Sequence, residues 1–128
     1  MKRITEEWIF KAETDFKVAK RELNTGEPVY DAVCFHCQQC VEKYLKAVLQ
    51  EKDVPFEKTH DLDVLLELCK NITSALLGLK PDLIELSSFA VEIRYPGIVA
   101  SRDEAEHFLT VTQKVRKIIR SYWGLEDS

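Results

Sequence analysis

The segment from Val29 to Gln50 constrains the fold most strongly, because it carries one long amphipathic pattern without glycine or proline. Its apolar side chains recur three and four residues apart, at Val33, Cys37, Cys40, Val41, Tyr44, Leu45 and Val48. This spacing places them on one face of an α-helix. The opposite face carries Glu42, Lys43, Lys46 and Gln50. The segment therefore predicts a helix that forms the apolar spine of the domain.

Glycine and proline punctuate the rest of the chain in short clusters, with no strand-type alternation between them. Four further helices are expected: from Thr5, as N-cap, to Asn24; from Thr59 or Asp61 to near Ser74; from Pro81 to Arg94; and from Ser101, in a capping box with Glu104, to Gly124. Amphipathic helices with short links predict an all-α fold, an up-and-down helical bundle of four to five helices.

The chain has 128 residues, of which 45% are hydrophobic, which suits a single domain over residues 1–128. Its formal charge of -4 argues against a protein that coats nucleic acid through a uniformly basic surface, although a local basic patch is compatible with it. No long apolar window or signal-type h-region is present. We therefore expect a soluble cytoplasmic protein with no membrane contact.

Three cysteines, Cys34, Cys37 and Cys40, surround His36 in a spacing that resembles zinc or iron–sulfur ligands. On a helix, however, the three thiols fan across roughly 120°, and Cys69 stands alone. Cysteine is also among the most buried residue types, and these three share the apolar stripe. Core packing in a reducing compartment is therefore favoured over a metal site, and no metal or cofactor is expected.

Arg102 and His107 form the most suggestive catalytic pair, because a guanidinium can hold a phosphate and an imidazole can act as general acid or base in RNA cleavage. A separation of five residues puts them about 140° apart on a straight helix. The capping box explains Ser101 and Glu104 without catalysis.

A run of basic residues without acids lies in the last expected helix, at Lys114, Arg116, Lys117 and Arg120. It suits the negative C-terminal end of the helix dipole, and a solvated face is favoured over a nucleic-acid groove.

Several stretches together resemble the HEPN family of small helical domains. These are Lys11 to Ala19, Tyr30 to Ala32 with Gln38 to Ala47, Lys58 to Leu62, and Arg94 to Gly97. The resemblance implies an up-and-down bundle, often a homodimer, in prokaryotic cytoplasm, frequently encoded beside a minimal nucleotidyltransferase as a toxin–antitoxin-like pair. Many relatives are metal-independent ribonucleases that use an arginine and a histidine separated by four to six residues and brought together across the dimer interface.

Arg94 resembles the family's arginine, but no histidine follows it in range, whereas Arg102 and His107 meet the spacing slightly later. Three functions are therefore open. The first is a binding module whose exposed Lys43, His60 and Arg94 engage a nucleotide, RNA or the nucleotidyltransferase. The second is an endoribonuclease that uses Arg102 and His107. The third is a structural dimerisation domain, whose exposed apolar surface is formed by Phe10, Phe35 and Trp123.

Overall fold

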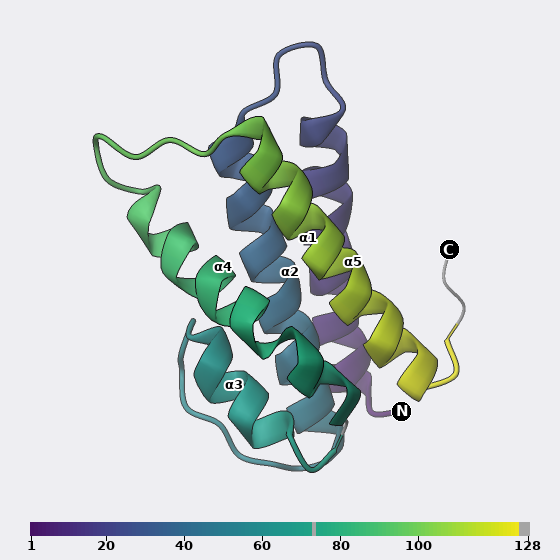
Figure 1. Cartoon of the computed structure of the whole chain (residues 1–128). Coiled ribbons are helices and arrows are strands. Elements are labelled where there is room, and N and C mark those ends of the chain that lie inside the picture. Colours follow the sequence, from purple (N-terminus) through teal and green to yellow (C-terminus); the bar gives the residue numbers. More distant parts are fainter. Residues whose placement is uncertain (73, 126–128) are drawn as a thin grey trace.

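The computed structural model describes residues 1–72 and 74–125, which form α-helices and one 3-10 helix and contain no strand. The elements are α1 (Arg3–Leu23), α2 (Tyr30–Glu51), α3 (Leu62–Cys69), η1 (Ser74–Leu79), α4 (Lys80–Glu92) and α5 (Arg102–Tyr122). Long helices alternate in direction along the chain (Figure 1). The predicted all-α, up-and-down bundle is therefore confirmed.

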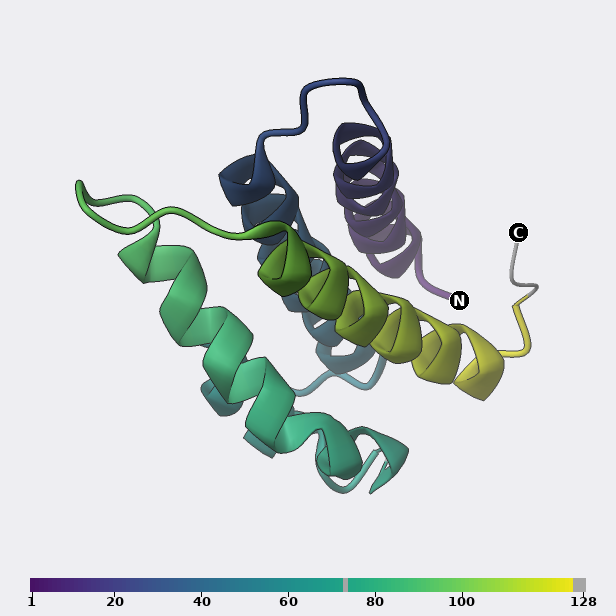
Figure 2. The ribbon, with the colours of Figure 1, turned by 45° about the horizontal axis from the view of Figure 1, so that its top comes forward.

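The helix α2 is the centre of the bundle, because it contacts each of the other four α-helices. Figures 1 and 2 show α1 and α4 on opposite sides of α2, with α5 lying across the front. The apolar stripe of α2 is wholly buried, from Val33 through Tyr44 to Val48. The predicted apolar spine is confirmed.

The charged face of α2, opposite the apolar stripe, is largely covered. Glu42 and Lys46 are only 3% and 6% exposed. The physical reason is the central position of the helix, since α1 and the loop before α3 flank this face. The two residues stand four apart on the helix and form an ion pair, with Lys46 Nζ 3.0 Å from Glu42 Oε2.

Two helix boundaries also differ from expectation. The first helix begins at Arg3, with Lys2 at its N-cap. Thr5, the expected cap, is buried instead, and its hydroxyl donates to Glu51 Oε1 at 2.8 Å, which ties the start of α1 to the end of α2. The third helix ends at Cys69, and η1 leads from Ser74 into α4.

The other predicted helix signals are confirmed. Asp61 accepts a hydrogen bond from the Asp63 backbone at the start of α3. Pro81 lies in the first turn of α4. The capping box of α5 is complete, because the Ser101 and Glu104 side chains each accept from the other residue's backbone N–H.

Exposed apolar side chains lie only partly where the sequence predicted them. Phe10 is 70% exposed, but Phe35 is half-buried, and Trp123 packs against the core. A change at Trp123 would therefore disturb the fold itself. No described helix combines the length and apolar character needed to cross a bilayer.

Candidate functional site

Separate segments of the chain bring polar side chains to one side of α2, which we call the α2 polar face. The helix itself contributes His36, Gln38, Gln39, Glu42, Lys43 and Lys46. Asp15 reaches this face from α1, and His60 reaches it from the loop before α3. Two carboxylates, those of Asp15 and Glu42, accept the hydrogen bonds that hold the other polar side chains of this face in place.

Asp15 is the first organising carboxylate. Its Oδ1 accepts a hydrogen bond from His36 Nδ1 at 2.8 Å, and its Oδ2 accepts one from Lys43 Nζ at 2.6 Å. The Lys43 side chain is 22% exposed, so it is held against α1 rather than projecting freely as the sequence suggested. Its position is fixed by the antiparallel packing of α1 on α2.

Glu42 is the second organising carboxylate and receives three donors. Its Oε1 accepts from His60 Nδ1 at 2.9 Å and from Gln38 Nε2 at 3.1 Å, while Lys46 Nζ binds Oε2. Gln38 Nε2 also donates to the backbone carbonyl of His60 at 2.9 Å. His60 is therefore anchored twice although its side chain is 74% exposed. Its Nε2, on the far side of the ring, is the atom that an incoming ligand would meet.

The chemistry of this face is that of a donor surface. Both carboxylates are buried and satisfied by at least two donors each, which is what buried charges require. Buried ion pairs contribute little net stability, because desolvation offsets their attraction. The His60 imidazole is exposed, and the Gln39 amide and Lys43 ammonium are partly so, which suits an anionic or hydrogen-bond-accepting ligand.

Arg94 borders the α2 polar face at the end of α4. Its guanidinium carbon lies 5.9 Å from the centroid of the Phe35 ring, and that ring meets the His36 ring edge-on at 5.2 Å. On the other flank, His60, Ser87 and Val91 line a shallow depression of about 340 Å³ between the start of α3 and α4. Lys43, His60 and Arg94 are thus all attached to this face, each through a different contact.

Arg102 and His107, by contrast, are held by different partners within one chain. Arg102 Nε donates to Glu106 at 2.8 Å, and Arg102 Nη1 lies 3.5 Å from the hydroxyl of Tyr30. His107 Nε2 lies 3.4 Å from Asp82 at the start of α4. Asp82 and His107, together with Glu85, could ligate a cation, since their donor atoms lie within 4.8 Å of one another.

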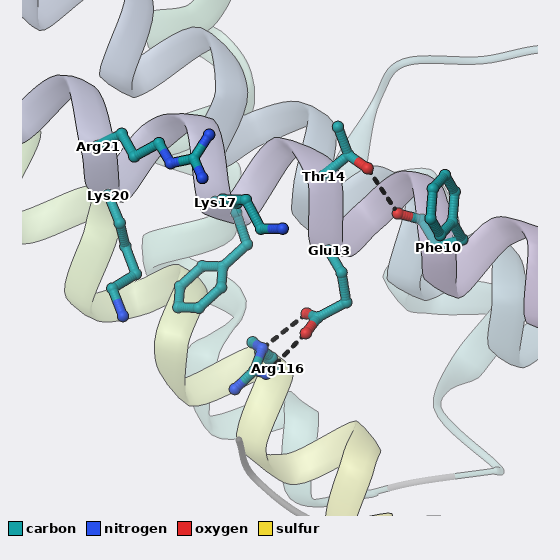
Figure 3. A pocket seen from close by; sticks show the side chains of 8 residues that line it. Phe10, Glu13, Thr14, Lys17, Lys20, Arg21 and Arg116 are labelled. Atoms are coloured by element: carbon teal, nitrogen blue, oxygen red, sulfur yellow. Dashed lines mark hydrogen bonds and ion pairs between the residues drawn. The ribbon is translucent and has the colours of Figure 1, made fainter.

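A second polar surface lies between α1 and α5, and we call it the basic groove (Figure 3). Its basic side chains are Lys17, Lys20 and Arg21 of α1 and Lys114, Arg116 and Lys117 of α5. The groove consists of two depressions of about 510 and 360 Å³ that share Phe16, Lys20 and Arg116. The sequence indicated only the α5 half.

Glu13 crosses this groove to bind Arg116, as Figure 3 shows. Its carboxylate accepts two bonds from the guanidinium, both at 2.7 Å, and one from the Tyr44 hydroxyl at 2.6 Å. Burial would raise the pKa of Glu13, but these hydrogen bonds outweigh it and the pKa is lowered. Arg116 is consequently 5% exposed, and the expected solvated face is wrong at this residue.

Comparison with known proteins decides the family. A model of the HEPN domain matches residues 5–122. The chain belongs to the HEPN family. The crystal structure of an archaeal HEPN homologue has a TM-score of 0.71 to this chain at 25% identity, covering 94% of this chain and 98% of that one. No curated protein matches the sequence. HEPN domains are generally nucleotide- or RNA-related.

The cysteines of this HEPN chain are core residues, as predicted. All four are free thiols with no exposed surface. Burial raises the pKa of Cys34, Cys37 and Cys69 to about 12. The thiols therefore remain protonated at neutral pH, whereas a metal ligand would be a thiolate.

Sequence reasoning missed the α1 half of the basic groove and the pairing of Asp82 with His107. Lys17, Lys20 and Arg21 occupy neighbouring positions three and four residues apart, and this local signal was available. Their approach to α5 was not, because it depends on how two distant helices pack.

Proposed function

We propose that this HEPN chain is a nucleotide- or RNA-associated binding module whose ligand face is the α2 polar face with Arg94. We further propose that it acts as a homodimer and as the partner of a minimal nucleotidyltransferase in a toxin–antitoxin-like pair. The observation that carries the proposal is the fixing of Lys43, His60 and Arg94 around α2 by contacts from separate segments.

A phosphorylated nucleotide fits the chemistry of this face. Arg94 offers a planar guanidinium that can bind two phosphate oxygens, and His60 offers an imidazole already oriented by Glu42. Arg94 lies over the ring of the half-buried Phe35, and a guanidinium plane is a surface on which an unstacked nucleobase can also stack. Because the acids of the face are already paired, they repel a phosphate less than free carboxylates would.

The direct test is binding of a nucleoside triphosphate, measured by calorimetry on the wild type, Arg94→Ala and His60→Ala. Both variants change exposed residues and should fold normally, yet each should weaken binding by tenfold or more, on the order of one lost charge-assisted contact. Arg3→Ala removes an exposed arginine from the opposite end of the bundle and should bind like the wild type. Equal binding by all four proteins would exclude this face.

The partner is tested separately by co-expression with a nucleotidyltransferase encoded beside this gene. We expect a tagged form of the chain to retain that protein through purification, whether or not nucleotide is present. Failure to co-purify would remove the partner from the proposal and leave the nucleotide site untouched.

Endoribonuclease activity is the second candidate, and the contact of His107 with Asp82 favours it, since a carboxylate orients an imidazole for acid–base work. Arg102 would hold the phosphate, with a second protomer bringing the two functions together. RNA cleavage that persists in chelator, disappears in His107→Ala and survives in His60→Ala would support it. Unchanged cleavage in His107→Ala would exclude that residue.

A further inference from the structure

The basic groove combines clustered basic side chains with an exposed aromatic ring, that of Phe10. We propose that it is a second ligand site, which binds the phosphate backbone of single-stranded RNA while Phe10 stacks on a base at its rim. The site lies between α1 and α5, away from Lys43, His60 and Arg94, and it does not depend on the function proposed for them.

Charge is the first argument. The chain as a whole carries a formal charge of -4, yet six basic side chains line this groove. Within the described part of the chain, Lys17, Arg21, Lys114 and Lys117 form no ion pair with an acidic side chain. Clustered, unneutralised cations attract polyanions and release counterions from a nucleic-acid backbone on binding.

The one acid among the described residues that line the groove does not oppose this field. Glu13 is committed to Arg116, Tyr44 and, at 3.9 Å, Arg120, so its charge is balanced from within the protein. The pair also joins α1 to α5 and fixes the distance between the basic residues of α1 and those of α5. Glu13 and Arg116 therefore form the paired base of the groove, and the exposed lysines line its sides.

The aromatic residues have two distinct roles. Phe16 is 8% exposed, and its ring is already contacted by Lys20 Nζ at 5.3 Å and by the Arg116 guanidinium at 4.7 Å from the centroid. It positions cations and is not open to a base. Phe10 lines the same depression and is 70% exposed, so its ring can stack. A basic channel with an open aromatic ring is the combination that binds single strands.

Single-stranded RNA is favoured over an acidic protein segment for this reason. Carboxylates on a peptide would use the lysines but would gain nothing specific from Phe10, whereas every base has a face that can stack. The shared depressions also form a continuous path along the helix pair, which suits a strand rather than a compact ion.

The test is fluorescence anisotropy of a labelled single-stranded oligouridylate with the full-length chain. Lys17→Ala/Lys117→Ala removes one cation from α1 and one from α5, and within the described residues neither lysine makes a hydrogen bond or ion pair that the change would break. We expect affinity to fall at least tenfold at low salt, and the slope of log affinity against log salt to decrease in magnitude by about 0.7 for each cation removed. Phe10→Ala should weaken binding roughly fivefold or more while leaving that slope unchanged.

The matched control is Lys70→Ala/Lys80→Ala, which removes the same charge from the side of the bundle formed by α3 and α4 and should bind RNA like the wild type. His60→Ala/Arg94→Ala should also retain this binding, so the two proposed sites fail or succeed separately. Loss of binding in both charge variants alike, loss in His60→Ala/Arg94→Ala alone, or no binding at low salt would each overturn the proposal. Equal competition by polyglutamate, with no effect of Phe10→Ala, would assign the groove to acidic proteins and overturn it for RNA.

Discussion

Glu42 and Lys46 show what a residue's neighbours along the chain determine and what they do not. Their spacing of four predicts an ion pair on any helix, and the pair is present. Their burial depends on α1 and on the loop that carries His60, which lie far away in the sequence. Local geometry was therefore predictable for these residues, whereas their environment was not.

Replacing Glu42 with glutamine should lower the free energy of unfolding by about 3 kcal/mol, because Lys46 and its charge then remain buried without a carboxylate. Chemical denaturation followed by circular dichroism measures this. Glu7→Gln provides the control, since Glu7 pairs with Arg3 at the same helical spacing but on the surface, and should change stability by no more than about 0.5 kcal/mol. Similar effects of the two changes would contradict the buried role of Glu42.

The four thiols make a second prediction at this scale. Because all are buried and their pKa values are raised, to about 12 for Cys34, Cys37 and Cys69, the folded protein should not react with iodoacetamide at pH 8. In denaturant, all four should be alkylated within minutes. Mass spectrometry of the intact protein counts the modified residues. Rapid labelling of the native chain would show that one of them is accessible.

At the scale of elements, helix positions were predictable but helix partners were not. The 3.6-residue periodicity, the capping box and the glycine and proline clusters are local, and they located the α-helices to within a few residues, except for the end of α3, which lies at Cys69 and not near Ser74. The Glu13–Arg116 pair joins residues of α1 and α5 that are distant along the chain, and nothing in either segment alone signals the other. For the same reason, the sequence did not predict that the basic residues of α1 lie beside those of α5 in the basic groove.

This contact should give the bundle a specific acid sensitivity. The pKa of Glu13 is lowered in the folded protein, so its contribution is complete above the unfolded-state value near 4.5 and is lost as pH falls through the lower folded value. Glu13→Gln should reduce the free energy of unfolding by about 2 kcal/mol at pH 7. The difference from the wild type should shrink progressively below pH 4.5. A difference that stays constant down to pH 2 would contradict this linkage.

At the scale of the whole molecule, several of the exposed apolar side chains belong to α3, to α4 and to the residues just after α4. They are Val64 and Leu68 of α3, Ile84 and Val91 of α4, and Tyr95 just beyond it. Exposed apolar residues on neighbouring helices are a common feature of an interface between copies. These residues fit the proposed homodimer better than Trp123 does, because Trp123 is partly buried against the core.

We therefore expect Val91→Asp to shift the protein from dimer to monomer, because a carboxylate would be buried in the interface. Light scattering after size-exclusion chromatography measures the mass of each species. Phe10→Asp places the same charge on an exposed aromatic residue across the bundle and should leave the dimer intact. Dissociation by Phe10→Asp but not by Val91→Asp would move the interface to α1.

The central position of α2 should also affect how fast its backbone amides exchange with solvent. Every other α-helix packs on it, so its backbone amides can reach solvent only when the bundle as a whole comes apart. Hydrogen exchange in the middle of α2 should therefore proceed at the rate set by global unfolding. The short α3 and η1 segments, at the edge, can open while α2 stays closed and should exchange sooner. The slowest-exchanging amides of the protein would then belong to the helix that also carries most of its candidate ligand site.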